Sequence, residues 1–168
     1  MSLVTRAVGA ATAVVLAAGG VAALGQPAFA SRVPGCVASH LRVVRHGTEG
    51  ATSHRYVKFR ITNTGTHACR LFGYPTFRYR AASGHPMGFG SKPAGVPAHV
   101  VRLAPGQHTR VTLGYVVPAV TLPRQCHARQ ASSVAVRLAF RSHVYHQPLR
   151  AKVCTTRTYR PAAYPVGF

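Results

Sequence analysis

The chain has 168 residues, of which 21 are Lys or Arg and one, Glu49, is acidic, so its formal net charge is +20 at pH 7. A single acidic side chain excludes glycosidases and aspartic proteases that use two acids, and it excludes calcium or magnesium sites built from carboxylates. A field of this sign attracts polyanions and is screened by salt.

The N-terminal stretch has the three regions of a cleaved secretory signal. Arg6 provides the positive start, Ala7–Leu24 is an apolar run, and Ala28-Phe29-Ala30 is a small-residue cleavage motif before Ser31. A retained membrane anchor is the alternative, although the run is only just long enough to span a bilayer and is weakly apolar. We therefore expect residues 1–30 to be a signal peptide and the protein to be secreted, with no transmembrane segment after cleavage.

Removal of residues 1–30 would leave 138 residues (168 − 30) and a net charge of +19 (20 − 1), because one arginine leaves with the signal. This length suits a single domain, which we expect over residues 31–168 with its core at about 36–157. Val33-Pro34-Gly35-Cys36 loosely resembles a lipid-attachment box, but Gln26–Arg32 separates it from the apolar run. An even number of cysteines in an exported chain favours disulfide pairing over lipid attachment.

Alternation of apolar and polar residues predicts short strands separated by turns. The clearest case is Tyr56–Thr62, in which Val57, Phe59 and Ile61 fall on one side of an extended chain. Asn63-Thr64-Gly65 follows and is typical of a turn. In chain order, the predicted strands are 40–46, 56–62, 76–80, 100–103, 109–117, 133–141, 144–149 and 151–157.

Three connections between these strands also have clear signals. Gly47–Gly50 predicts a loop, 83–97 predicts a long Gly- and Pro-rich loop with at most one short edge strand, and 118–129 predicts a connection with at most one helical turn. No window outside the N-terminal stretch has a convincing helical period. Seven or eight short strands with turns between them predict an all-β fold, an antiparallel β-sandwich.

The outward positions of the predicted strands are basic. Strand exteriors ordinarily carry charge, so it is the single sign of the charge that departs from the usual mixture. The candidate anion-binding surface consists of Lys58, Arg60, Arg78, Arg80, Arg110, Arg137 and Arg141.

Four cysteines, Cys36, Cys69, Cys126 and Cys154, allow three disulfide pairings. We favour Cys36–Cys69 and Cys126–Cys154, because each pair joins regions that flank neighbouring strands and staples one half of the chain. Zinc binding is the alternative, but the spacings contain no C-x-x-C pair.

Several of these motifs occur together in a known family. They are, in order, Cys36, Thr62–Gly65, Cys69–Pro75, Leu103–Gly106, Cys126 and Cys154. With them the chain resembles a family of secreted actinobacterial domains known as domain of unknown function 4232, over about residues 36–154, which is most of the chain that would remain after cleavage. The block from Asn-Thr-Gly to Gly-Tyr-Pro is its most specific part. The resemblance implies an exported, disulfide-bonded, immunoglobulin-like sandwich and carries over no catalytic residues.

Histidine is the remaining candidate for chemistry, because a Ser-His-acid triad has only Glu49 available, in a Gly-flanked segment without a nucleophile motif. The ten histidines show no metal-ligand spacing, and His143 and His146 fall on opposite faces of an extended segment. Two disulfides would leave no thiol nucleophile. We therefore expect no enzymatic activity, no metal site and no cofactor.

Two functions are compatible with these features. The first is a secreted module that associates with anionic cell-envelope polymers, acidic lipids or other polyanions, is held at the cell wall by charge, and lacks sequence-specific nucleic-acid recognition. The second is an extracellular protein-recognition or inhibitor domain that presents the loop 83–97, with Met87, Phe89 and Lys92. A structural loop that closes one end of the sandwich is the simpler interpretation of 83–97.

The shortage of acids predicts resistance to acid unfolding. Carboxylates that are paired in a native protein lose that stabilisation as the pH falls through their folded-state pKa, and Glu49 is the one side chain able to do so here. Protonation of all ten histidines would raise the formal charge from +19 to +29. Circular dichroism should show little unfolding caused by carboxylate titration between about pH 5 and about pH 3. A steep transition in that window would contradict this expectation.

Overall fold

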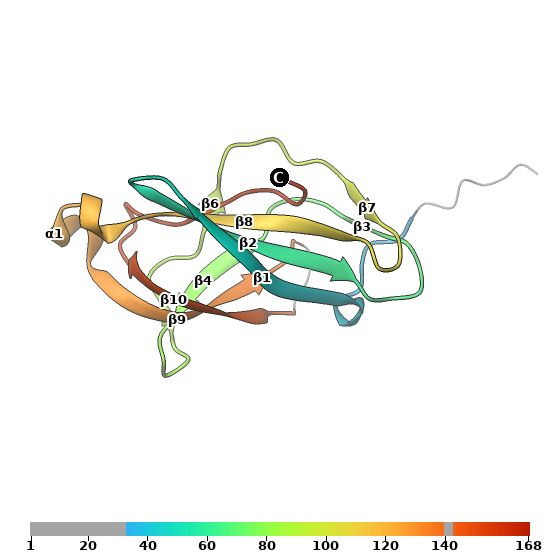
Figure 1. Ribbon diagram of the computed structural model, residues 1–168, viewed down its shortest axis with the longest axis horizontal. Coiled ribbons are helices and arrows are strands. Elements are labelled where there is room, and N and C mark those ends of the chain that lie inside the picture. The colour runs from blue at the N-terminus through green and yellow to red at the C-terminus, as the bar shows by residue number, and fades with distance from the viewer. Residues whose placement is uncertain (1–32, 140–142) are drawn as a thin grey trace, which may run out of the picture. The chain divides into compact units, whose positions relative to one another are not determined.

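The structure is a computed structural model that describes residues 33–139 and 143–168 (Figure 1). The expected signal peptide, together with Phe140 and Arg141 from the predicted strand 133–141, lies outside the described residues. The strands are β1 (Leu41–Gly50), β2 (His54–Asn63), β3 (Cys69–Leu71), β4 (Thr76–Arg80), β5 (Pro86–Met87), β6 (Lys92–Pro93), β7 (Val101–Leu103), β8 (His108–Val116), β9 (Ala128–Arg137), β10 (Tyr145–Cys154) and β11 (Ala162–Ala163). The helical elements are η1 (Ala38–His40), η2 (Pro118–Val120) and α1 (Pro123–Cys126).

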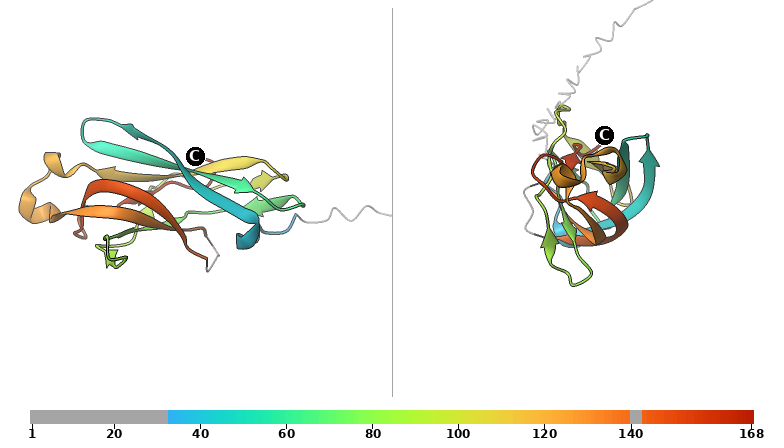
Figure 2. Two further views of the ribbon diagram at one scale, coloured as in Figure 1. Left: turned by 60° about the horizontal axis from the view of Figure 1, so that its bottom comes forward. Right: turned by 90° about the vertical axis from the view of Figure 1, so that its left-hand side faces the viewer.

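Two sheets pack face to face (Figure 2). The first has the strand order β1-β2-β8-β11-β6, the second has the order β10-β9-β4-β5, and β3 pairs with β7 in a separate ladder. If β1, β2, β4, β8, β9 and β10 are lettered A, B, C, E, F and G, the orders β1-β2-β8 and β10-β9-β4 become A-B-E and G-F-C. These are the strand orders of an immunoglobulin domain. Every strand pair is antiparallel except β6 with β11. Of the eleven strands in the described part, eight have three or more residues, which confirms the predicted sandwich.

The predicted inward residues of β2 form the centre of the core. Val57, Phe59 and Ile61 are all fully buried. The Phe59 ring stacks on Phe77 of the second sheet with centroids 5.5 Å apart. Burial of each such side chain stabilises the fold by about 1.5–3 kcal/mol. Tyr79 is also buried, and its hydroxyl has no hydrogen-bond partner among the described residues. Burial, and to a smaller extent the nearby Tyr115, raises the pKa of Tyr79.

Two predicted breaks in the chain are in fact continuous strands. The expected loop at Gly47–Gly50 belongs to β1, because a bulge after Arg45 shifts the register and lets the pairing with β2 continue. The predicted strands 144–149 and 151–157 are one strand, β10, whose register shifts after Pro148. A slip in alternation resembles the end of a strand when only the sequence is considered, whereas a bulge absorbs that slip within the ladder.

The C-terminal segment completes the first sheet, which the alternation pattern did not predict. β11 pairs with β8, and Ala163 and Val166 are each 1% exposed within the core. Hydrogen bonds from Tyr164 N to Thr112 O (3.0 Å) and from Val166 N to Gly73 O (3.0 Å) hold the segment in place. Thr112 was expected to face solvent, but this covering segment leaves it only 3% exposed.

The two disulfides are Cys36–Cys69 and Cys126–Cys154, which confirms the favoured pairing. The first joins the segment before β1 to β3. The second joins α1 to the end of β10. The connection 118–129 contains two helical turns, η2 and α1, where at most one was expected.

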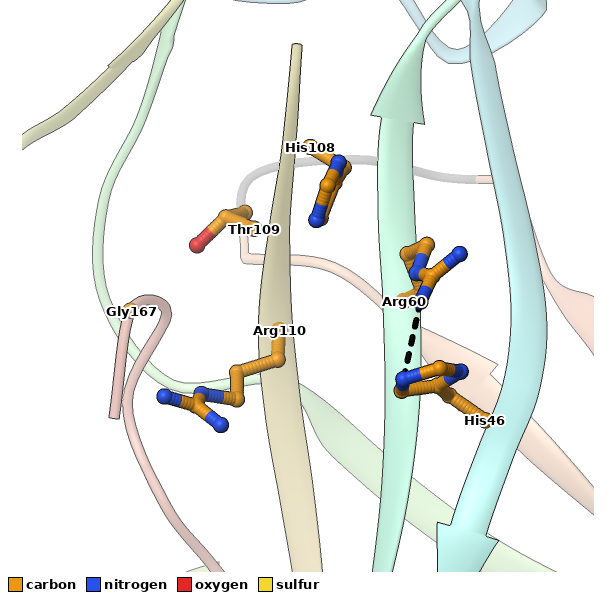
Figure 3. Close-up of a pocket in the computed structure, with 6 residues that line it drawn as sticks. All are labelled: His46, Arg60, His108, Thr109, Arg110 and Gly167. Atoms are coloured by element: carbon orange, nitrogen blue, oxygen red, sulfur yellow. Dashed lines mark hydrogen bonds between the residues drawn. The ribbon is translucent and has the colours of Figure 1, made fainter.

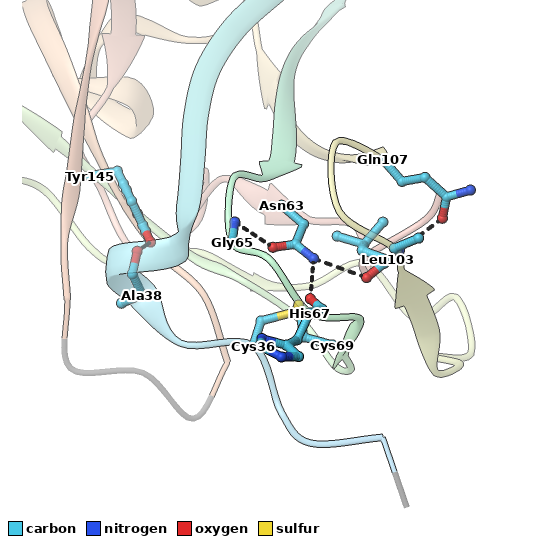
Figure 4. Close-up of a disulfide and its surroundings, with 10 residues drawn as sticks. Cys36, Ala38, Asn63, Gly65, His67, Cys69, Leu103, Gln107 and Tyr145 are labelled. Atoms are coloured by element: carbon cyan, nitrogen blue, oxygen red, sulfur yellow. Dashed lines mark hydrogen bonds between the residues drawn. A yellow bond between two sulfur atoms is a disulfide. The ribbon is translucent and has the colours of Figure 1, made fainter.

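Asn63, at the end of β2, is the polar centre of this end of the sandwich (Figure 4). The residue is 1% exposed, and its Nδ2 donates to the carbonyls of His67 (2.9 Å) and Leu103 (3.1 Å). Its Oδ1 accepts from the amide of Gly65 (3.0 Å). All three partners are backbone groups, so this side chain fixes the turn after β2 and ties it to β7.

Replacement Asn63→Ala should leave these backbone groups without partners in a nearly dry site. We expect the free energy of unfolding to fall by about 2–4 kcal/mol. The exposed neighbour Thr64 is the matched control, and Thr64→Ala should change the free energy of unfolding by less than about 0.5 kcal/mol. Urea denaturation followed by circular dichroism measures both, and equal effects of the two substitutions would show that Asn63 lacks this role.

Candidate functional site

Cationic side chains meet on the outer face of the first sheet, where β2 and β8 are neighbours. Residues directly opposite each other in an antiparallel pair share a face, and Arg60 lies opposite Arg110. Lys58 lies opposite Thr112 on the next rung of the same face, which is about 6.6–6.8 Å further along the strands. Because like charges directly opposite are unfavourable, the two arginines diverge. Arg110 extends towards the turn at Gly167, and Arg60 extends towards β1 (Figure 3).

A histidine of β1 reaches the same face. Nη2 of Arg60 lies 2.8 Å from Nε2 of His46 (Figure 3). A guanidinium group can only donate, so Nε2 accepts and the imidazole in this arrangement is neutral, with its proton on Nδ1. Protonation of His46 would remove this acceptor and free the Arg60 donor for an anion.

These side chains line a hollow of about 350 Å³. We refer to it as the basic hollow, and its lining residues are His46, Arg60, His108, Thr109, Arg110 and Gly167. Gly167 has a φ of 89°, a conformation that favours glycine, and its amide donates to the Arg110 carbonyl (2.9 Å). The Arg110 side chain forms no hydrogen bond with the described residues. The basic hollow therefore offers guanidinium donors and no acidic side chain, which suits an anion.

The single acidic side chain of the sequence lies beside this face. Glu49 of β1 forms an ion pair with Lys58, and the two side chains are 67% and 24% exposed. An exposed pair of this kind contributes about 0–1 kcal/mol to stability. Its larger effect is electrostatic, because it neutralises Lys58 and leaves Arg60 and Arg110 without a carboxylate side chain as partner.

The predicted anion-binding surface is divided between the two sheets. Its described members are Lys58, Arg60 and Arg110 on the first sheet, and Arg78, Arg80 and Arg137 on the second. In the second group, Arg78 donates to the carbonyl of Gly88 (3.1 Å). Because the sheets pack through their inner faces, the two groups lie on opposite sides of the sandwich and do not form one surface. Arg141 lies outside the described residues.

Two histidines of the basic hollow were not part of the predicted surface. His108 has a signal in the sequence, because it precedes Arg110 by two residues and so shares its face of β8. His46 falls outward by alternation on β1, but nothing in the sequence places that strand beside β2 in the register that brings His46 to Arg60. Only the strand pairing reveals this contact.

The segment 83–97 contains two short strands where at most one was expected. β5 pairs with β4, and β6 pairs with β11. Met87 is 7% exposed and belongs to the core, so its side chain is not presented to a partner as protein recognition through this segment would require. Phe89 and Lys92 do lie at the surface.

Within residues 33–139 and 143–168, no three His, Cys, Asp or Glu side chains are placed to hold a metal ion. All four cysteines are in disulfides. No helix in this part of the chain is long and apolar enough to cross a membrane.

Comparison with known proteins identifies the family of the chain. No curated protein and no solved structure matches it. A family model described as Domain of unknown function (DUF4232) matches residues 36–161, which is most of the chain and includes all four cysteines and strands β1 to β10. The chain therefore belongs to the DUF4232 family, as its cysteine and Gly-Tyr-Pro motifs predicted.

Proposed function

We propose that this protein is a secreted, non-enzymatic domain that binds anionic polymers of the cell envelope, or other polyanions, through the basic hollow. The observation that carries the proposal is the rung formed by Arg60 and Arg110. The two guanidinium groups share a solvent-facing surface with His46 and His108, and neither has an acidic partner. A bound anion would neutralise charges that the fold itself leaves uncompensated.

A polymer suits this face better than an isolated ion. Two guanidinium groups share one rung, with His46 and His108 beside them, and each contact with a charged chain releases bound counterions and adds to the affinity. The positive field of the whole molecule would increase the rate at which such a chain is captured. Arg78, Arg80 and Arg137 on the opposite sheet provide a second group of contacts for another segment.

The location outside the cell is part of the proposal. Two disulfides persist in oxidising compartments and are rare in the cytosol, and the N-terminal sequence has the pattern of a secretory signal. Electrostatic attraction to an anionic polymer would then retain the secreted protein at the cell wall without a lipid or a membrane anchor.

Replacement of both central arginines tests the site. Arg60→Gln with Arg110→Gln should weaken binding to an anionic polysaccharide such as heparin and reduce the slope of log affinity against log salt by about one per lost contact. The matched control, Arg78→Gln with Arg137→Gln, removes the same charge from the other sheet and should have the smaller effect. Titrations at several salt concentrations measure both variants. Equal losses would mean that net charge alone governs binding, and a heparin affinity that does not fall with salt would contradict the proposal.

The histidines of the basic hollow predict stronger binding in acid. Any proton that His46 or His108 takes up adds positive charge beside Arg60 and Arg110, so affinity for the same polymer should be higher at about pH 5.5 than at about pH 7.5. His46→Gln with His108→Gln should remove most of this rise. His85→Gln with His146→Gln is the control, because both residues are exposed outside the basic hollow. A rise that survives in the first variant and disappears in the control would exclude this explanation.

A further inference from the structure

A second hollow lies next to the basic hollow on the same face of the first sheet. It has a volume of about 410 Å³, and we refer to it as the aromatic hollow. Tyr56, Tyr164 and Phe168 line it together with Lys58, Arg110 and Glu49. Arg110 lines both hollows, so a ligand held in one can extend into the other.

A glycine in β8 makes room for the aromatic rings. Gly114 lies opposite Tyr56, and a Cβ atom at this position would lie 3.3 Å from Cε1 of Tyr56 and 3.2 Å from Cε2 of Tyr164. Both distances are tighter than ordinary van der Waals contact. The missing side chain therefore allows both tyrosine rings to lie against the strand and form the floor of the aromatic hollow.

The C-terminal segment runs alongside β8 (Figure 1) and carries two of the rings, those of Tyr164 and Phe168. The amide of Tyr164 donates to the carbonyl of Thr112, and the amide of Gly167 donates to the carbonyl of Arg110. Val166, which lies between these two residues in the sequence, is buried. Phe168 stacks on Tyr164 with centroids 4.5 Å apart, yet it remains 48% exposed. Burial, followed by the proximity of Tyr56, raises the pKa of Tyr164, so its hydroxyl stays neutral at pH 7. The rings are thus fixed, and they add no negative charge.

The composition of the aromatic hollow indicates a ligand that is both anionic and ring-shaped. A simple anion or a polyphosphate chain would use Arg110 but would have no use for the aromatic rings. A sugar ring has a face of C–H groups that packs on an aromatic ring and hydroxyl groups that seek hydrogen-bond partners. Glu49 can accept hydrogen bonds from such hydroxyls, and the tyrosine hydroxyls can both donate and accept.

The arrangement of the rings disfavours single-stranded nucleic acid. Proteins that hold such strands place successive bases on aromatic platforms along a basic groove. Here Tyr164 stacks on Phe168 and meets the edge of Tyr56, with centroids 5.9 Å apart in the second pair, so the three rings form one cluster.

We propose that the aromatic hollow binds a sugar ring of an anionic polysaccharide whose acidic groups contact Arg110 and the basic hollow. This inference rests on the proposed function and specifies its ligand as a charged glycan. The cationic residues supply the attraction that depends on salt, and the aromatic residues distinguish a polysaccharide from other polyanions.

Three polyanions and two kinds of variant test this inference. Heparin has charged sugar rings, polyphosphate has charge without rings, and oligothymidylate has phosphates with aromatic bases. Phe168→Ala removes an exposed ring, and Gly114→Val displaces the floor of the hollow without changing charge. Phe72→Ala is the matched control, because Phe72 is 46% exposed and does not line the hollow. Thermal melting confirms that each purified variant is folded, and titrations at about 0.15 M salt give the affinities.

We expect Phe168→Ala and Gly114→Val each to weaken heparin binding about five-fold or more, which is the lower end of the effect of one aromatic stacking contact. Polyphosphate binding should change by less than about two-fold, and Phe72→Ala should bind heparin as the unaltered protein does. Unchanged heparin binding in both ring variants, with a loss in Arg60→Gln, would overturn the sugar-ring subsite and leave the proposed function standing. A loss for oligothymidylate alone would assign the hollow to nucleic acid and overturn it too. Failure of the unaltered protein to bind heparin at all would reject both proposals.

Discussion

Among the described residues, all but one of the guanidinium and ammonium groups must be satisfied without an acidic side chain, because Glu49 is the only acidic residue in the sequence and it pairs with Lys58. Backbone carbonyls take the place of the missing acids. Arg55 donates to the carbonyl of Ala51 (2.6 Å), and Arg160 donates to that of Ser91 (3.1 Å). A carbonyl satisfies the hydrogen bond but cancels no net charge, so the positive field of the molecule persists outside its surface.

The stability of the fold must therefore come from sources other than ion pairing. The two sheets bury a continuous apolar core, and Asn63 satisfies backbone groups at one end of it. The disulfides close segments with sequence separations of 33 and 28 residues, and in the chain-entropy account each stabilises the folded state by about 3–4 kcal/mol. These contributions are almost insensitive to carboxylate titration, and they oppose the mutual repulsion of the cationic surface.

The same constraint gives the outer face of the first sheet its chemistry. Strand pairing places Arg60 opposite Arg110, and the fold provides no acid between them. The C-terminal segment then adds Tyr164 and Phe168 beside this rung, because Gly114 leaves space on β8 for the rings. Charge and aromatic surface thus meet on one face from three regions of the chain that are distant in sequence.

Much of the architecture was predictable because its signals are local. The alternation of Val57, Phe59 and Ile61 indicated both the strand and its buried side, and the burial of these residues is complete. The cysteine positions and the turn motif at Asn63 indicated the disulfide pairing and the family. The sequence signals failed where the continuity of a strand depended on pairing with its neighbour, as at the bulge of β1 and the register shift of β10.

The sequence by itself determined that the chain forms a β-sandwich with cationic outer faces, because apolar alternation and the shortage of acidic residues are properties of the sequence alone. The tertiary structure decided which cations meet. Arg60 and Arg110 became neighbours while Arg78 went to the opposite side, since cross-strand partners are set by topology and register. It also decided that Phe168 belongs to the same face as Arg110, because that contact depends on β11 docking against β8.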